Sequence, residues 1–235
     1  MCRHAAWLGA PRALATLLEG DAGLIRQSYA PRMQRCGAVN ADGFGAGWYA
    51  PARAEPVRYR RAVPIWTDAN LPGLAAVAAS RCLVAAVRSA TEGCAVEESA
   101  TAPFTHGPWL LSHNGRVAHS ALRSLLLGRD PESGTDSAWL ATAVFARLDA
   151  GLPLQEAVAE VVTLAAAADP GARLNLIVAD GGLVAATAWG DTLFAHLSDG
   201  ALIASEPLDH RPGWHAVPDH HLVLATPDGV VTSPL

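Results

Sequence analysis

Three short turns that contain Asp-Gly divide the last part of the chain into pairs of apolar segments. An Asp-Gly turn between two such segments is typical of a β-hairpin, and the two strands of a hairpin pair antiparallel. We therefore expect an antiparallel sheet in this part of the chain. The turns are residues 180–182, 198–200 and 227–229, and the expected strands are 173–179, 183–189, 193–197, 201–205, 222–226 and 230–232.

Helical patterns lie apart from these strands along the sequence. Thr135 or Ser133 is the expected N-cap of a helix over 136–149, and Gly151 follows the end of that helix. Segregated helices and antiparallel strands indicate an α+β fold, and the lack of a Pro/Gly/Ser-rich linker indicates one domain over 1–235. Other helices are expected at 11–19, 118–127 and 156–168, and other strands at 44–49, 83–88 and 109–112.

Composition excludes several classes of function. The chain is 51% hydrophobic and 17% charged, which is typical of a folded core and not of a disordered protein. All 17 basic residues are arginine, so Schiff-base and Walker-A chemistry, which need lysine, are excluded. The net charge of −5 argues against nucleic-acid binding. The densest basic cluster, Arg58, Arg60 and Arg61, is interpreted as a solvated strand face.

No pattern in the sequence predicts a metal site, a disulfide scaffold or a membrane span. The four cysteines, at 2, 36, 82 and 94, include no C-x-x-C pair, and the chain has no H-E-x-x-H. No uncharged apolar run approaches the 18 or more residues that span a bilayer, and no secretory leader opens the chain. We expect a cytoplasmic protein without metal or cofactor.

Cys2 is the residue best suited to act as a nucleophile. Removal of Met1 is expected because the next side chain is small, and it would place a thiol and an α-amine on one residue. An α-amine has a pKa of about 7.7–8.0 and can serve as a base near neutral pH. The other interpretation of Cys2 is a buried core cysteine.

Three further segments suit the hydrolysis of an amide. The Asn114 side chain and the Gly115 backbone N–H can donate to an oxyanion, although Asn-Gly is also an ordinary turn after a strand. Arg88 can bind a carboxylate, or it can make a surface ion pair. Asp136 can bind an ammonium group, or it can cap a helix.

These segments together resemble the class II glutamine amidotransferases, which are N-terminal-nucleophile hydrolases with a four-layer αββα sandwich. The resemblance implies that Cys2 is the nucleophile and that Asn114 and Gly115 form the oxyanion hole. It also implies that the γ-glutamyl group of a small-molecule substrate is held by Arg88 and Asp136, with Thr91 in the same segment as Arg88. The matching residues, in order, are Cys2, 40–45, 88–93, 114–115 and Asp136.

The chain resembles more closely one branch of that family. This branch cleaves the γ-glutamyl amide of γ-glutamyl-hercynylcysteine sulfoxide, giving glutamate and hercynylcysteine sulfoxide, in ergothioneine biosynthesis. No partner protein is implied. The alternatives are a glutaminase subunit that supplies ammonia to a synthase, and an inactive amidase fold used for binding. The matching segments are 2–4, 7–11, 27–31, 86–91, 111–115 and 189–192.

Ser89 and Glu92 depart from the wider family, which commonly has tryptophan and histidine at these two positions. The departure suggests a remodelled rim of the site. We expect Glu92 to meet the trimethylammonium group of the leaving half. Trp7, Trp48 and Trp109 lie near the motifs and are candidates for contact with the same cation.

Overall fold

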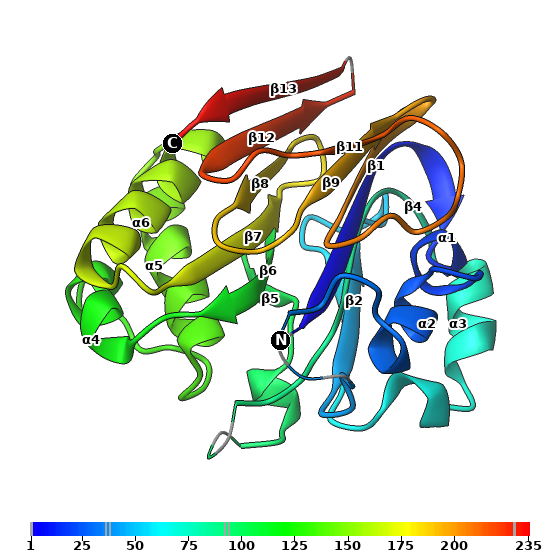
Figure 1. Ribbon diagram of the computed structural model, residues 1–235, viewed down its shortest axis with the longest axis horizontal. Coiled ribbons are helices and arrows are strands. Elements are labelled where there is room, and N and C mark those ends of the chain that lie inside the picture. The colour runs from blue at the N-terminus through cyan, green and yellow to red at the C-terminus, as the bar shows by residue number, and fades with distance from the viewer. Residues whose placement is uncertain (1, 36, 38, 92, 94, 228) are drawn as a thin grey trace.

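Two antiparallel sheets face each other in the computed structural model, and helices cover the outer face of each sheet (Figure 1). The structure describes residues 2–35, 37, 39–91, 93, 95–227 and 229–235. Within these residues the first sheet has the strand order β11-β9-β10-β1-β4-β2-β3 and the second has the order β13-β12-β8-β7-β6-β5. This arrangement confirms the α+β class and the four-layer αββα sandwich.

The strands of the first sheet are β1 (Arg3–Ala13), β2 (Phe44–Trp48), β3 (Val57–Arg61), β4 (Ala79–Val87), β9 (Phe194–Leu197), β10 (Gly200–Ala204) and β11 (Trp214–Ala216). Those of the second are β5 (Phe104–His106), β6 (Trp109–Arg116), β7 (Arg173–Ala179), β8 (Val184–Ala188), β12 (His221–Thr226) and β13 (Gly229–Pro234). The helices are α1 (Ala15–Leu18), α2 (Leu24–Tyr29), α3 (Leu71–Val77), α4 (His119–Leu122), α5 (Asp136–Asp149) and α6 (Leu154–Ala168), with 3-10 turns η1 (Ile65–Thr67), η2 (Glu98–Ala100) and η3 (Arg123–Leu126).

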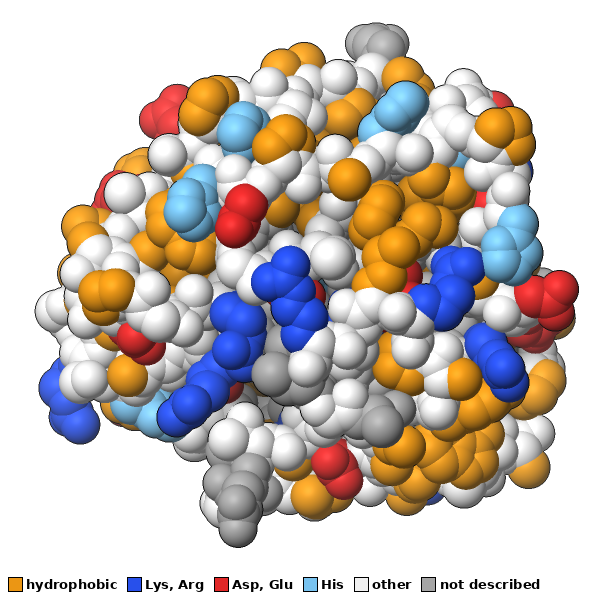
Figure 2. All heavy atoms as spheres, in the orientation of Figure 1, with side chains coloured by type: hydrophobic (Ala, Val, Ile, Leu, Met, Phe, Trp, Pro, Cys, Tyr) orange, Lys and Arg blue, Asp and Glu red, His pale blue; other side chains and the backbone are white. Residues whose placement is uncertain are grey.

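Three apolar cores hold the four layers together. One lies between α1–α3 and the first sheet, one lies between the two sheets, and one lies between the second sheet and α4–α6. The facing strands alternate in side-chain direction, so each sheet supplies one face to the central core and the other to its helices. Figure 2 shows that hydrophobic side chains also gather on the surface over the end of α2 and η1.

The three predicted hairpins are confirmed. β7 pairs with β8, β9 with β10 and β12 with β13, each antiparallel. The third turn contains Asp228, which lies outside the described residues. The helix over 136–149 is also confirmed, and Thr135 is its N-cap because its side chain accepts a hydrogen bond from the Ala138 N–H.

The helix predicted over 11–19 is wrong. β1 continues to Ala13, and only Ala15–Leu18 are helical. β1 is an inner strand that pairs with both β4 and β10, so tertiary pairing overrides the local helical pattern. The pairing of β1 with β4 is irregular between Leu8 and Arg12, and Pro11 occupies this irregular stretch, where a missing N–H is tolerated.

Other predicted boundaries differ in smaller ways. The helix expected over 118–127 is split into α4 and η3, and the helices α2 and α3 were not predicted. The strand expected to end at Ser112 continues to Arg116, so Asn114 and Gly115 lie within β6 and not in a turn. The interpretation of Asn-Gly as a turn is therefore wrong.

The sheet register brings separate segments to one end of the sandwich. Arg3 pairs with Val87, so the start of β1 lies beside the end of β4. β6 lies in the facing sheet, and its Ser112 contacts His4 of β1 across the central layer, with 3.1 Å between Oγ and Nδ1. Cys2 therefore lies next to the end of β4 and opposite the second half of β6.

Candidate active site

Cys2 lies half-buried at the beginning of β1. Its Sγ is 3.9 Å from the backbone oxygen of Ser89, the second residue after β4. Burial raises the pKa of the Cys2 thiol, while the positive charge of Arg88 acts in the opposite direction and the negative charge of Asp136 raises it further. The thiol is therefore protonated near neutral pH, and it needs a base before it can attack.

A narrow pocket opens beside Cys2. Its free volume is about 20 Å³, enough for about one water molecule. The walls come from the ends of β1 and β4, from β6 and from the first turn of α5. The lining residues are Cys2, Ala86, Val87, Arg88, Ala100, Thr101, Ala102, Phe104, His113 and Ser137.

Arg88 follows β4 and is almost fully buried in the pocket wall. Its guanidinium donates to the backbone oxygens of Asp42, at 3.3 Å, and Ala95, at 2.9 Å. Within the described residues it makes no ion pair with a carboxylate. The surface ion pair considered from the sequence is therefore not formed there, and the positive charge is available for the carboxylate of a ligand.

Asn114 presents an unusual buried amide. The residue is fully buried in β6, and neither Nδ2 nor Oδ1 has a hydrogen-bond partner among the described residues. Leaving a buried polar group unpaired costs about 1–3 kcal/mol, so such groups mark places where a ligand or water binds. Since Ser112 faces His4 across the sheets, Asn114, two residues along the strand, points to the same central layer.

The space around position 115 admits no side chain larger than that of glycine. A Cβ at this position would lie 1.9 Å from the backbone oxygen of Arg173 and 2.6 Å from Nε2 of His113. The ladder also sets the direction of its N–H. Leu174 donates to Trp189 on the β8 side, so Asn175 and its partner Asn114 direct their N–H groups into the β6–β7 ladder.

Successive N–H groups of a strand point to opposite sides, so the Gly115 N–H points away from β7. It faces the edge of β6 along which β5 does not extend. β5 pairs only with residues up to Leu111. The next N–H on this edge, that of Val117, donates to Asp136 Oδ2 at 3.0 Å. The Gly115 N–H and Asp136 therefore lie on the same side of the strand.

Asp136 is the first residue of α5. Its two carboxylate oxygens accept the backbone N–H groups of Val117, at 3.0 Å, and Ser137, at 2.8 Å. It makes no ion pair within the described part of the chain, and it is near enough to Cys2 to affect the pKa of that thiol. Asp136 itself does not line the pocket, but its neighbour Ser137 does, so a negative charge without a cationic partner among the described residues lies close to the pocket wall.

Comparison with known proteins decides the family. The family described as glutamine amidotransferases class-II matches residues 19–199. The chain is 50% identical to the γ-glutamyl-hercynylcysteine sulfoxide hydrolase of Mycolicibacterium smegmatis over 100% of both chains. It is 47% identical to the protein of the same name from Mycobacterium tuberculosis over 100% of this chain and 97% of that one.

The chain belongs to the class II glutamine amidotransferases. A solved structure of a class-II domain protein from Silicibacter pomeroyi has a TM-score of 0.65 to this chain at 23% identity, covering 99% of each. At that identity the likeness concerns the fold, and it agrees with the sandwich described above.

One residue of the 88–93 segment does not lie beside Cys2 in this amidotransferase. Thr91, predicted to contact substrate, is exposed in the loop after β4 and is not among the residues that line the Cys2 pocket. Glu92, predicted to meet the leaving half of the substrate, lies outside the described residues. The contact from this segment that reaches Cys2 is the Ser89 carbonyl.

Two buried histidines flank the site and were not predicted from the sequence. His113 donates from Nε2 to the Arg173 carbonyl at 2.9 Å, so its Nδ1 accepts from Ser137 Oγ, also at 2.9 Å. Burial lowers the pKa of His113. Burial also lowers the pKa of His4, to about 3, and the nearby His113 and Arg3 lower the pKa of His4 further. Both rings are neutral near pH 7. The available sequence signal was their position in the matching segments, where His4 lies two residues after Cys2 and His113 directly precedes Asn114.

A buried charge cluster, also not predicted, lies behind the nucleophile. Arg3 is 3.9 Å from Asp191 and 3.6 Å from Glu206, and all three side chains are inaccessible to solvent. Arg3 Nε also donates to Gln34 on the loop between α2 and β2. This contact holds the loop against the beginning of β1.

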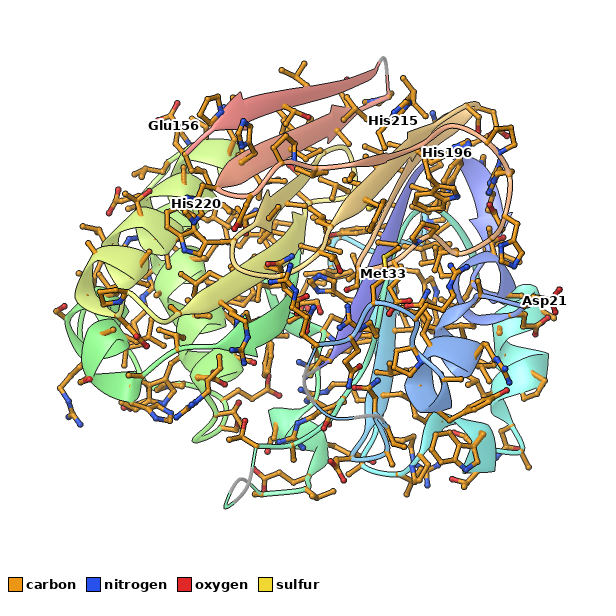
Figure 3. All side chains as sticks on the ribbon, in the orientation of Figure 1. Asp21, Met33, Glu156, His196, His215 and His220 are labelled. Atoms are coloured by element: carbon orange, nitrogen blue, oxygen red, sulfur yellow. The ribbon has the colours of Figure 1, made fainter. Side chains whose placement is uncertain are left out.

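The described part of the chain has no group of three or more His, Cys, Asp or Glu residues that could hold a metal ion. Figure 3 shows His196, His215 and His220 apart from one another, the first on β9, the second on β11 and the third in the turn before β12. No helix within the described ranges is long and apolar enough to cross a membrane.

Proposed function

We propose that this chain is a γ-glutamyl-hercynylcysteine sulfoxide hydrolase, releasing glutamate and hercynylcysteine sulfoxide. The observation that carries the proposal is 50% identity over the full length of a relative with that name. Residues 1–235 act as one cytoplasmic amidotransferase domain from which Met1 is removed. The small-molecule amide is its only partner, and no metal or cofactor takes part.

The γ-glutamyl half binds first through its charges. Arg88 holds the α-carboxylate, because its guanidinium is anchored by backbone oxygens and makes no ion pair among the described residues. Asp136 holds the α-ammonium, because its carboxylate is positioned by backbone N–H groups. Two such contacts place the amide carbonyl over Cys2 and replace a bimolecular encounter by a positioned one.

Attack by Cys2 needs the amine created by removal of Met1. Since burial raises the pKa of the thiol, the α-amine of Cys2 takes its proton as the sulfur bonds to the carbonyl carbon. The same amine delivers that proton to the leaving nitrogen as the C–N bond breaks. A γ-glutamyl thioester remains, and water cleaves it with the amine again as base, restoring the thiol.

The developing oxyanion is stabilised by two donors of β6. The Asn114 amide is buried and has no partner in the described structure, and the Gly115 N–H points to the open edge of the strand. Preorganised donors of this kind each contribute about 10²–10³ in rate.

The test is glutamate release by N-terminally sequenced protein from γ-glutamyl-hercynylcysteine sulfoxide and from glutamine at equal concentration. We expect strong preference for the sulfoxide and complete loss in Cys2→Ala. Preference for glutamine would indicate a glutaminase that supplies ammonia. No activity with a free Cys2 amine would indicate a binding protein. Either result contradicts the proposal.

A further inference from the structure

A second and larger cavity lies on the other side of Phe104 from the Cys2 pocket. Its volume is about 300 Å³, within the range of small-molecule sites. Phe104 lines both spaces, and α5 continues from one to the other, with Ser137 in the first wall and Ala138 in the second. The other lining residues are Arg58, Thr105, His106, Arg129, Asp130, Glu132, Ala141, Thr142 and Phe145.

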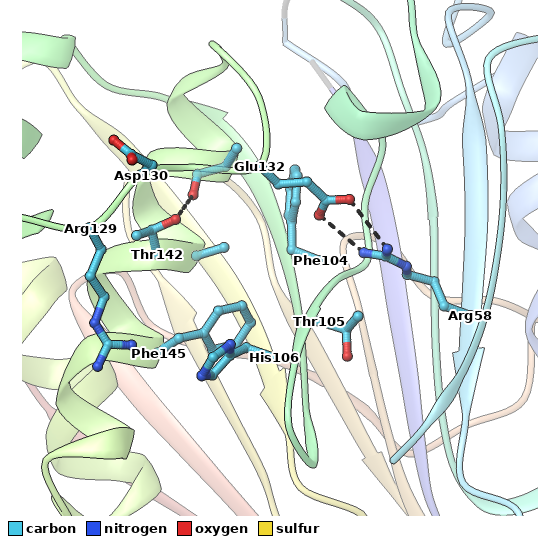
Figure 4. Close-up of a pocket in the computed structure, with 11 residues that line it drawn as sticks. Arg58, Phe104, Thr105, His106, Arg129, Asp130, Glu132, Thr142 and Phe145 are labelled. Carbon is cyan, nitrogen blue, oxygen red and sulfur yellow. Dashed lines mark hydrogen bonds and ion pairs between the residues drawn. The ribbon is translucent and has the colours of Figure 1, made fainter.

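Aromatic rings form one wall of this cavity (Figure 4). His106 stacks on Phe145 with 5.8 Å between ring centres and on Trp109 with 6.1 Å. Phe104 completes the wall nearest to Cys2. Faces of aromatic rings attract quaternary ammonium groups.

Charged side chains of both signs surround the opening of this larger cavity. Arg58 of β3 pairs with Glu132 at 3.1 Å, across the cavity from α5 (Figure 4). Glu132 also pairs with Arg60 at 2.5 Å, and Arg60 donates to the Thr101 carbonyl in the wall of the Cys2 pocket. One chain of contacts thus connects the rim of the larger cavity to the candidate nucleophile site.

We infer that this cavity binds the leaving half of the substrate and determines which γ-glutamyl amides are hydrolysed. The inference rests on the proposed function, because hercynylcysteine sulfoxide carries a trimethylammonium group together with carboxylates. The aromatic wall suits the cation, and so does Asp130, a lining carboxylate with no ion pair in the described structure. The leaving groups of glutamine and other small amides are too small to reach these contacts.

Thr142 provides a direct test, because it lies on the cavity wall and its hydroxyl bonds only to Ala138 of its own helix in the described structure. Thr142→Trp would fill the cavity. Thr163→Trp is the matched control, since Thr163 makes the same hydroxyl contact to Ala159 on the exposed face of α6. Steady-state kinetics compares γ-glutamyl-hercynylcysteine sulfoxide with γ-glutamylmethylamide, and calorimetry measures binding of hercynine, the trimethylated histidine.

We expect Thr142→Trp to raise KM for the sulfoxide and weaken hercynine binding by about tenfold or more, the loss of roughly one favourable cation contact. The ratio of kcat/KM for the two amides would change by a similar factor, and Thr163→Trp would match the wild type. Unchanged hercynine binding in Thr142→Trp, or equal loss of activity on both amides, would overturn the inference. Failure of the wild type to hydrolyse the sulfoxide would refute the proposed function, while hercynine binding would still test the cavity.

Discussion

At the scale of single residues, the candidate site contains polar groups whose burial without a partner lowers the stability of the folded protein. The Asn114 amide is buried with both polar atoms unpaired among the described residues, whereas the neighbouring Asn175 amide is fully used. Asn175 donates to Asp191 and Thr192 and accepts from Trp189. Two asparagines that face each other across the β6–β7 ladder therefore serve different purposes.

Replacement of each asparagine by leucine distinguishes a catalytic role of Asn114 from a structural role of Asn175. Asn114→Leu removes an unpaired amide, so we expect kcat to fall by about 10²–10³ while stability is maintained or rises by about 1 kcal/mol. Asn175→Leu would instead lose about 2–3 kcal/mol, because it leaves three backbone groups without their partner. Glutamate release and urea unfolding measure the two effects. Equal destabilisation by both substitutions would show that the Asn114 amide is structural.

At the scale of elements, the beginning of α5 links helix stability to substrate binding. The Thr135 hydroxyl caps the helix, and the next residue is the carboxylate that we propose binds the substrate ammonium. Fraying of the first turn would displace Asp136 from the edge of β6, where it accepts the Val117 N–H.

Removal of this cap is therefore expected to affect binding as well as stability. Thr135→Ala should cost about 1 kcal/mol and raise KM more than it lowers kcat. Thr135→Ser keeps the capping oxygen and is the control. Thermal unfolding and steady-state kinetics measure both quantities. A loss of stability with unchanged KM would separate the cap from the positioning of Asp136.

At the scale of the whole molecule, the sandwich buries polar groups in its central layer because strands from both sheets contribute to the site. His4 of the first sheet meets Ser112 of the second, and burial lowers the pKa of His4 from 6.5 to about 3. The folded state therefore excludes a proton that the unfolded chain binds below pH 6.5.

Stability should consequently decrease as pH falls. The contribution of neutral His4 is fully present above pH 6.5 and is lost on acidification toward pH 3, by up to about 1.4 kcal/mol per pH unit. Urea unfolding between about pH 7 and pH 4 measures this slope. His4→Asn should flatten it, and exposed His210→Asn should not. An unchanged slope in His4→Asn would contradict the assignment.

Much of the fold could be predicted from the sequence, while the roles of the candidate site residues stay predictions. Asp-Gly turns indicated the three hairpins, and Thr135 with Gly151 indicated α5, because both signals depend on backbone preferences of a few adjacent residues. The candidate site residues were selected by their chemistry and their order in the chain: Cys2, Arg88, Asn114, Gly115 and Asp136. In the described structure, the side chains of all of these except Gly115 have no carboxylate, amide or cationic side-chain partner that would occupy them.

Only the tertiary structure decided where these residues lie and what they contact. Residues 11–13 belong to β1 because β4 and β10 pair with that strand, although their local pattern favours a helix. Asn114 lies in a strand and not in a turn, its side-chain amide has no hydrogen-bond partner among the described residues, and Phe104 separates two adjoining cavities. These properties arise from contacts between segments far apart in the chain, so no local preference specifies them.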